Sequence, residues 1–217
     1  MAKVIIVAGF SGTGKSTSIR NMDPAKTYIL NVLGKDLPFK GSRKLYSTEI
    51  GNMGVTDSYK LVPKAIEAAV KKGYKHMIID DIGYIMSTEF FDRVEEKGYD
   101  KFNSIGSHMQ QIIKAAKDSE LETVTLFFHL DNDPNTGVQL RTIGRLLQDK
   151  YDPAGVVEIL LVTNVKDSPE GPVYTFVTNR TTIAGNILPA KSPMDMFDLE
   201  IDNDLDFVIN KINEYYV

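Results

Sequence analysis

GFSGTGKST, residues Gly9–Thr17, decides the fold and fits the phosphate-binding pattern G-x-x-x-x-G-K-[ST]. The glycines let the backbone turn tightly and aim several N–H groups inward at phosphate oxygens. Lys15 brings a positive charge to the β- and γ-phosphates of a nucleotide, and the Ser16 hydroxyl can ligate Mg²⁺. The stretch therefore predicts a P-loop whose residues hold a triphosphate: Gly9, Phe10, Ser11, Gly12, Thr13, Gly14, Lys15, Ser16 and Thr17.

The sequence on both sides of this loop supports the prediction. Val4–Ala8 (VIIVA) is a short, apolar, β-branched run, typical of a buried strand that leads into the loop. Gly14–Met22 is predicted to form a helix whose N-terminal dipole favours the same anion. A chance glycine-rich turn would not come with this strand–loop–helix order, so we favour a nucleotide site.

Composition is that of an ordinary globular chain. Of its 217 residues, 42% are hydrophobic and 25% are charged, and no linker divides them, so we expect one P-loop ATPase domain over residues 1–217. The chain has no cysteine, which excludes disulfides and thiolate catalysis and fits a reducing, cytoplasmic interior. No signal peptide and no apolar stretch near the ~20 residues of a membrane helix is found, so we expect no membrane partner.

A second motif, His76–Asp81 (HMIIDD), ends an apolar run in two carboxylates. This order is typical of a Walker B strand, in which Asp80 holds Mg²⁺ on the side opposite Ser16. The alternative is a plain strand followed by an acidic turn. Because an intact P-loop stands upstream, we favour the metal-binding interpretation and expect Ser16 and Asp80 to share one Mg²⁺.

Apolar runs and helical periodicities alternate along the rest of the chain. Further strands are expected at 28–33, 45–48, 123–130, 156–165 and 173–178, and helices at 58–72, twice within 82–118, at 139–151 and at 205–216. Polar or irregular segments are expected at 34–44, 131–138 and 179–193. The order predicts an α/β fold: a mainly parallel sheet flanked by helices, with an antiparallel β-hairpin at its edge. Ligands of such folds lie at the carboxyl ends of the strands, where the P-loop, Asp80 and His129 all fall.

Three classes of P-loop protein remain open at this point. A GTP-binding switch needs an N-K-x-D motif, and the nearest stretch, TNVKD at 163–167, has the wrong order. A kinase of nucleotides or other small molecules needs an arginine-rich lid, which Arg141–Arg145 (RTIGR) could supply. The third class is a RecA-like ATPase.

An ordered set of motifs resembles the RecA-like ATPases of bacteriophages that are grouped with the Sak single-strand-annealing recombination proteins. The resemblance spans nearly the whole chain and rests on GFSGTGKST, INVLGKDLPFKG, IIDDI, FFHLDND, RTIGRLL, FVTN and AKSPMDMF. It implies one RecA-type core that binds ATP and Mg²⁺ and couples ATP hydrolysis to single-stranded DNA. The chain departs from bacterial relatives, which place a catalytic Glu after the second strand, where Asn31 stands here, and it is acidic overall, with a net charge of −4.

Residue roles follow from the motifs together with this resemblance. We expect Asp81 to orient the attacking water, with capping of the next helix as the alternative, and His129 to sense the γ-phosphate, with a purely structural histidine as the alternative. By the same resemblance, Arg141, Arg145 and Lys150 would contact DNA phosphates, or one of the two arginines would reach a neighbouring subunit's ATP.

Partners are expected on the same basis. The resemblance implies single-stranded DNA, an annealing or single-strand-binding protein, a homo-oligomer, and the host cytoplasm as the location. Residues 195–206 carry six carboxylates and no basic residue. They form either a solvated connector or a strip that docks on the basic loop 35–44 of a neighbouring subunit.

Overall fold

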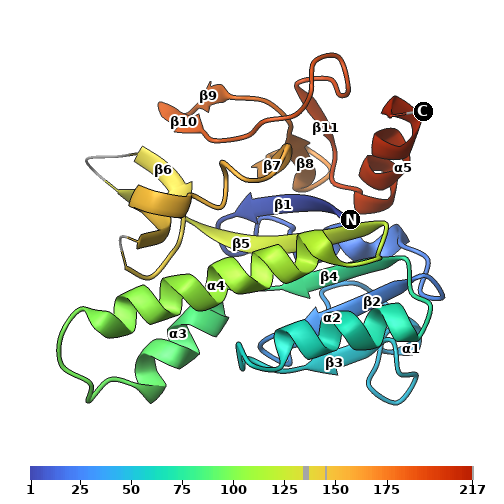
Figure 1. The fold of residues 1–217 in the computed structure, drawn as a ribbon. Coiled ribbons are helices and arrows are strands. Elements are labelled where there is room, and N and C mark those ends of the chain that lie inside the picture. The colour runs from blue at the N-terminus through green and yellow to red at the C-terminus, as the bar shows by residue number, and fades with distance from the viewer. Residues whose placement is uncertain (134–136, 145, 217) are drawn as a thin grey trace.

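A computed structural model describes residues 1–133, 137–144 and 146–216. Within these ranges, nine strands form the main sheet (Figure 1). The strands lie in the order β11 (Glu200–Asp202), β8 (Val173–Val177), β7 (Ile159–Lys166), β1 (Lys3–Gly9), β5 (Thr123–Asp133), β4 (His76–Asp80), β2 (Thr27–Asn31) and β3 (Met53–Val55). The ninth strand, β6 (Gly137–Leu140), pairs with the end of β5.

Six strands that are adjacent in this order, β7, β1, β5, β4, β2 and β3, run parallel to one another. β6, β8 and β11 run antiparallel to their neighbours. The predicted hairpin is the β7–β8 pair, so the expected fold class is confirmed. β5 lies between β1 and β4, which separates the P-loop strand from the strand that ends in Asp80. In this register Gly9 lies beside His129, and Asn31 lies beside Asp80. The carboxyl ends of four central strands therefore meet at one edge of the sheet.

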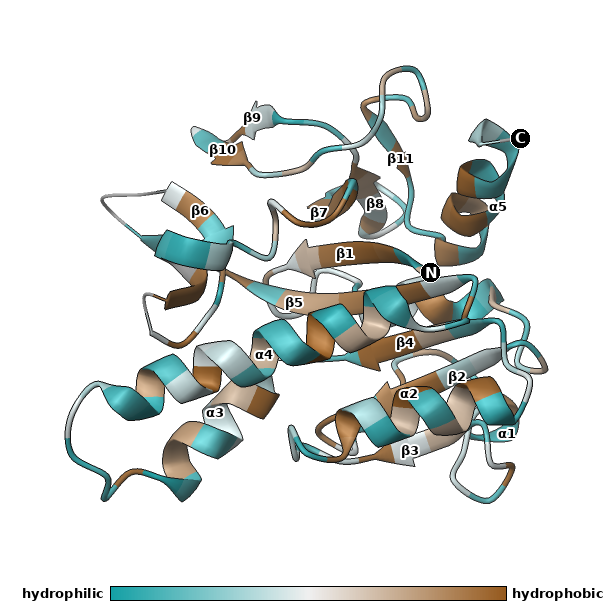
Figure 2. Ribbon diagram, in the orientation of Figure 1, coloured by the Kyte–Doolittle hydropathy of each residue, from teal (hydrophilic) through white to brown (hydrophobic). Residues whose placement is uncertain are grey.

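Helices cover both faces of the sheet, as a parallel sheet requires. One face carries α2 (Val62–Lys71), α3 (Gly83–Asp92) and α4 (Asp100–Asp118), and the other carries η1 (Ser16–Asn21), α1 (Ser42–Leu45) and α5 (Leu205–Tyr215) (Figure 1). β1 shows why both faces need cover: its side chains alternate between the two apolar cores, with Ile6 in one and Ile5 in the other. Figure 2 shows the apolar central strands and the polar outer sides of α2 and α4.

The helix predicted over residues 14–22 is wrong in type and length. The chain forms a 3₁₀ helix, η1, of six residues. Its sequence STSIRN is rich in residues that form helices poorly. The Ser18 hydroxyl also competes for the backbone by donating to Lys15 O at 2.6 Å. The P-loop is thus followed by a short helix with little dipole, so a phosphate would depend on loop N–H groups and on Lys15.

The strand predicted at 45–48 is also wrong. Residues 42–45 form α1, and the edge position is taken by β3. The Asn52 side chain explains the difference, since it donates to Leu45 O (2.8 Å) and accepts from Ser47 N–H (3.1 Å). These bonds satisfy backbone groups that a strand would have offered to a neighbour.

Two segments predicted to be loops contain short hairpins instead. β5 extends to Asp133 and pairs with β6 across residues 134–136, which lie outside the described residues. Within 179–193, β9 (Thr181–Ile183) and β10 (Asn186–Leu188) pair around a turn in which Ala184 and Gly185 both have positive φ.

The helix predicted at 139–151 is reduced to the five-residue π-helix η2 (Leu147–Tyr151). β6 occupies the start of that segment, and Arg141 N–H continues the pairing by donating to His129 O at 2.8 Å. Gly144, at φ 78°, then interrupts any helix. Arg141 is therefore presented on extended backbone beside the sheet edge rather than on a helical lid.

Candidate functional site

A cavity of about 570 Å³ opens at the carboxyl ends of the central strands. Its volume is that of a typical small-molecule site. The cavity is lined by P-loop residues, by residues in or just after β2, β4, β5 and β6, and by Tyr174 on β8. The full set is Phe10, Ser11, Gly12, Gly14, Lys15, Ser16, Thr17, Asn31, Lys35, Asp36, Pro38, Asp80, Asp81, Tyr84, His129, Leu130, Arg141 and Tyr174. The predicted site residues Lys15, Ser16, Asp80, Asp81, His129 and Arg141 are thus brought together, whereas Arg145 lies outside the described residues.

Lys15 lies at the centre of the P-loop. Its Nζ donates to Gly9 O (2.9 Å) and Phe10 O (3.0 Å), and the residue is only 6% exposed. Burial lowers the pKa of Lys15, and the carboxylates of Asp81 and Asp80 oppose that change. A buried ammonium group that faces carboxylates and backbone oxygens can transfer to phosphate oxygens without leaving the loop.

Gly9 and Thr13 do not line the cavity but face Thr163 on β7. Thr13 Oγ1 lies 2.5 Å from Thr163 Oγ1, which also donates to Ala8 O at 3.3 Å. A Cβ built on Gly9 would lie 1.8 Å from Thr163 Oγ1. The first glycine of the motif is therefore required by close packing against β7, and not by contact with a ligand.

We predict that Gly9→Ala lowers the free energy of unfolding by about 1–3 kcal/mol, because the added methyl group overpacks against Thr163. Chemical denaturation measures the change. Gly83→Ala is the matched control, since its added Cβ would meet no heavy atom closer than Arg141 O at 3.7 Å. Adding Thr163→Ala to Gly9→Ala should restore part of the loss. Equal denaturation midpoints for Gly9→Ala and wild type would contradict the packing argument.

Ser16 and Asp80 form the pair expected to hold a metal ion. Ser16 Oγ donates to both carboxylate oxygens of Asp80, at 3.0 and 2.8 Å. Burial, followed by the charge of Asp81, raises the pKa of Asp80 to about 6. A hydroxyl and one carboxylate, completed by phosphate and water oxygens, form the donor set that Mg²⁺ prefers in nucleotide sites, so these residues fit the ion. No group of three or more acidic or histidine side chains suited to a metal occurs in the described ranges.

Asp81 points into the cavity. One carboxylate oxygen lies 2.9 Å from His129 Nε2, and the other lies 3.6 Å from Lys35 Nζ. Burial would raise the pKa of Asp81, but the hydrogen bond from His129 and the nearby positive charges outweigh it, so the pKa falls below its usual value. The side chain does not cap α3, whose N-cap, Ile82, has no side-chain hydrogen bond. Asp81 adopts φ 64°, an unusual angle for a residue other than glycine.

His129 connects the acidic pair to the cavity wall. Its ring lies edge-on to Tyr84, with centroids 5.7 Å apart, and Tyr84 follows Asp81 by three residues. Arg141 lies beside His129 through their backbone hydrogen bond and is exposed at the cavity rim. Next to these residues a smaller pocket of about 60 Å³ is lined by Gly83, Tyr84, Ser87, His129, Arg141 and Ile143.

Sequence reasoning missed several residues of the cavity. Lys35 was assigned to a basic loop, yet it forms the ion pair with Asp81. Asn31 holds the same loop by donating to Lys35 O at 2.5 Å. Tyr174, on β8, packs against Gly14. The sequence does show that Gly34 and Lys35 come shortly after β2. Only the strand order shows that β2 lies beside β4 and so brings Lys35 near Asp81.

Comparison with known proteins supports the architecture. No family model matches the chain. Among solved structures, the chain is similar to a KaiC-like protein from the hyperthermophilic archaeon Pyrococcus horikoshii OT3, with a TM-score of 0.50 and 13% sequence identity. The match covers 86% of this chain and 88% of that chain. At this identity the likeness is one of fold, and it agrees with the RecA-like α/β architecture expected from the motifs.

Proposed function

We propose that the chain, as one P-loop ATPase domain over residues 1–217, binds ATP with Mg²⁺ and hydrolyses it. The observation that carries this proposal is the Ser16–Asp80 hydrogen-bonded pair beside Lys15, with the Asp81–His129 pair next to it in the same cavity. The first pair and Lys15 suit a metal-bound triphosphate. The second suits the activation of water.

The site residues then have the following roles in hydrolysis. Lys15 and the loop N–H groups neutralise the phosphates, and Ser16 and Asp80 hold Mg²⁺, which would offset the charge that develops on the phosphate oxygens. Asp81, kept ionised, accepts a hydrogen bond from the attacking water and orients it. His129 fixes the Asp81 carboxylate through Nε2, and with a proton on Nδ1 as well the ring would donate to the γ-phosphate from that second nitrogen. Arg141, at the rim, adds positive charge at the same end.

Hydrolysis needs a place for water beside Asp81. The pocket of about 60 Å³ lined by Tyr84, His129 and Arg141 adjoins the main cavity and is large enough to hold water. A kinase acting on a small acceptor is the alternative.

The deciding experiment measures phosphate release from ATP with Mg²⁺, with EDTA, and with added single-stranded DNA. Mg²⁺-dependent release of free phosphate supports the ATPase. Formation of ADP only in the presence of a nucleoside, nucleotide or other acceptor, with a phosphorylated product, favours the kinase. Wild-type protein that neither binds nor hydrolyses ATP contradicts both.

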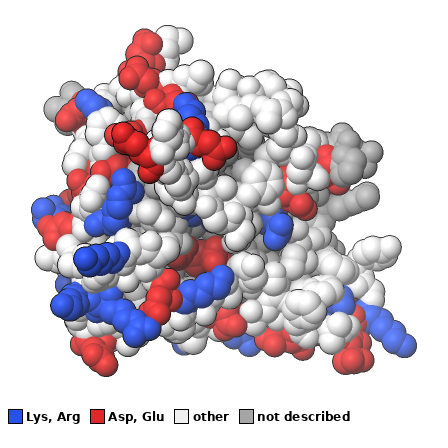
Figure 3. All heavy atoms as spheres, turned by 180° about the vertical axis from the view of Figure 1, so that it is seen from behind, with Lys and Arg blue, Asp and Glu red and all other residues white. Residues whose placement is uncertain are grey.

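The finer role that we propose is in phage DNA recombination or replication, with single-stranded DNA as partner. Support comes from the resemblance to Sak-type ATPases and from basic groups near the cavity. Figure 3 shows Lys and Arg side chains gathered on the side of the molecule where α1 lies. Arg43 in that region is paired with Asp36 by two hydrogen bonds, which leaves Lys35, Lys40 and Lys44 as the other basic groups of the loop. A homo-oligomer and an annealing or single-strand-binding partner belong to the same proposal.

We predict that Arg141→Gln weakens binding of single-stranded DNA and reduces the salt dependence of binding by about one unit of slope in log K against log [salt]. The reason is the loss of one phosphate contact. Fluorescence anisotropy with a labelled oligonucleotide over a salt series measures both quantities. Arg180→Gln is the control, because Arg180 is exposed but does not line the cavity. No binding by wild type at low salt would remove DNA from the proposal.

A further inference from the structure

The corner where β11 leads into α5 forms a fixed surface behind the P-loop. Asn203, at its centre, is 1% exposed, and its main-chain N–H donates to Tyr174 O at 3.3 Å. Asp204 caps α5 by accepting from the main-chain N–H groups of Asp206 and Phe207. The corner is therefore anchored to β8 on one side and to α5 on the other.

Two side chains of η1 reach across to this corner. Arg20 Nη1 donates to the main-chain oxygen of Asn203, to its Oδ1 at 3.5 Å, and to Thr17 O at 3.2 Å. Asn21 Nδ2 donates to Asp204 Oδ2 at 2.6 Å. A six-residue 3₁₀ helix has few hydrogen bonds of its own. These contacts therefore fix the position of η1 and of the loop that precedes it.

Gly14 of the P-loop packs directly against the corner. A Cβ built on Gly14 would lie 2.8 Å from Tyr174 Cδ1 and 3.3 Å from Asn203 Nδ2. Within the described part of the chain, Asn203 Nδ2 has no hydrogen-bond partner, although it is buried. A buried amide donor without a partner is unfavourable, and in a native protein it requires an explanation. The whole carboxamide of Asn203 lies against Gly14, with Oδ1 at 3.4 Å from the same Cβ position, so the neighbour of this donor is the turn of the phosphate-binding loop.

We propose that Asn203 is a positioning residue of the nucleotide site, whose buried amide donates to the P-loop backbone when the loop closes around a triphosphate. The inference rests on the proposed function, since it concerns the same ATP site. Nucleotide binding then supplies the hydrogen bond that the amide lacks, and the bond adds to nucleotide affinity. The contact acts on the loop and not on the base, so it serves any ligand that carries the triphosphate.

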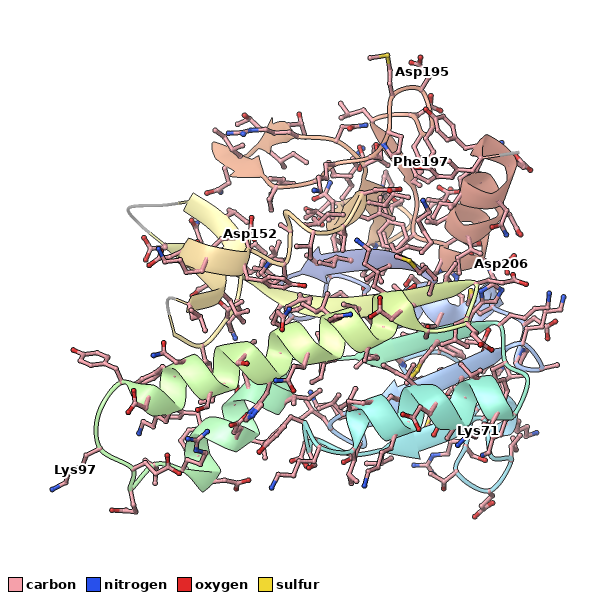
Figure 4. All side chains as sticks on the ribbon, viewed as in Figure 1. Lys71, Lys97, Asp152, Asp195, Phe197 and Asp206 are labelled. Carbon is pink, nitrogen blue, oxygen red and sulfur yellow. The ribbon has the colours of Figure 1, made fainter. Side chains whose placement is uncertain are left out.

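By this proposal, the acidic segment 195–206 anchors the corner that holds Asn203 in place. Figure 4 shows Asp195 at the outer tip of the segment and Asp206 at its other end, where α5 begins. Between them, Glu200 is held by hydrogen bonds from Lys166 and Thr175, and Asp204 is held by Asn21. These carboxylates anchor the corner against η1 and the sheet.

The experiment measures dissociation constants for ATP and for inorganic tripolyphosphate by calorimetry, together with KM and kcat, for Asn203→Ala and Asn203→Asp. Asn210→Ala, an exposed amide on α5, is the matched control. We expect both Asn203 variants to bind both ligands about tenfold more weakly, with kcat at saturating ATP within about twofold of wild type. Asn203→Asp keeps the oxygen that faces Arg20 but replaces the amide donor with a carboxylate, so Asn203→Ala is the variant that removes the donor without adding charge. Asn210→Ala should match wild type.

Binding by Asn203→Ala equal to wild type would overturn the proposal, because the donor would then have no use. Thermal unfolding with and without ligand distinguishes a positioning role of Asn203 from a purely structural one. We expect a small change in the Tm of the nucleotide-free variant and a reduced rise in Tm when tripolyphosphate is added. A large fall in the nucleotide-free Tm, with an unchanged rise on ligand addition, would show a structural role only. If wild type binds neither ATP nor tripolyphosphate, the proposed function fails first.

Discussion

Lys15→Ala should abolish measurable ATP hydrolysis and weaken nucleotide binding while leaving the fold intact. The Lys15 ammonium group is buried at the turn of the P-loop, where its neighbours are backbone oxygens and the carboxylates of Asp80 and Asp81. Without this ammonium group, the negative charges of the triphosphate and of the two carboxylates would repel each other with no lysine charge to offset them. Loss of one preorganised charge of this kind reduces turnover by about 10²–10³-fold.

The fold should survive because Lys15 belongs to neither apolar core. Phosphate release and nucleotide titration measure the function, and circular dichroism with thermal unfolding measures the fold. Lys211→Ala, at a partly exposed position of α5, is the matched control and should retain wild-type activity. Wild-type turnover in Lys15→Ala would show that the P-loop is not the catalytic phosphate site.

The second large effect separates the two aspartates that end β4. Asp80→Asn should lose Mg²⁺-dependent nucleotide binding and hydrolysis together, because the carboxylate that faces Ser16 is the proposed metal ligand. Asp81→Asn should keep binding and lose turnover by about 10²–10⁴-fold, because the lost group acts on water. Asparagine adopts positive φ readily, so the backbone angle of 64° at residue 81 remains accessible to the variant.

Equilibrium binding of a fluorescent ATP analogue, with Mg²⁺ and with EDTA, distinguishes the two variants, and single-turnover hydrolysis measures the chemical step. Normal turnover in Asp81→Asn would place the water-orienting group elsewhere. Glu49, the carboxylate that follows residues 45–48, is the next candidate, but it lines a separate recess of about 300 Å³ and not the nucleotide cavity. A pair of variants that lose binding equally would show that both aspartates serve the metal.

The sequence predicted the longer elements of the fold well, for a physical reason. Strands buried on both faces, such as β1, β4 and β5, are continuous apolar runs, and α4 repeats apolar residues every three or four positions. The short strands β6, β9, β10 and β11 have only three or four residues each, which is too short to show a periodic pattern. Pairing with a neighbouring strand, and not the local sequence, determines their structure. The hairpins within 131–140 and 179–193 were missed on that account.

The candidate site divides in the same way. Lys15, Ser16, Asp80 and Asp81 lie on motifs whose spacing is local, and His129 lies near the end of an apolar run, so all could be found in the sequence. Lys35 and Asn203 could not be found in this way. The proximity of Lys35 to Asp81, and of Asn203 to the P-loop, depends on which strands are neighbours. A basic loop and an acidic tail are surface features by composition, and only the folded sheet brings Lys35 into the cavity and Asn203 against the P-loop behind it.

The central place of β1 has a consequence for how the chain is made. β1 is completed at residue 9, but its two partners begin at residues 123 and 159. A ribosome adds about 5–20 residues per second, so this apolar strand waits on the order of 10 s for its first neighbour. Contacts so distant in sequence also slow folding after release. During that interval VIIVA is an unpaired, aggregation-prone segment, and a nascent chain of this protein is a natural substrate for chaperones that hold exposed strands.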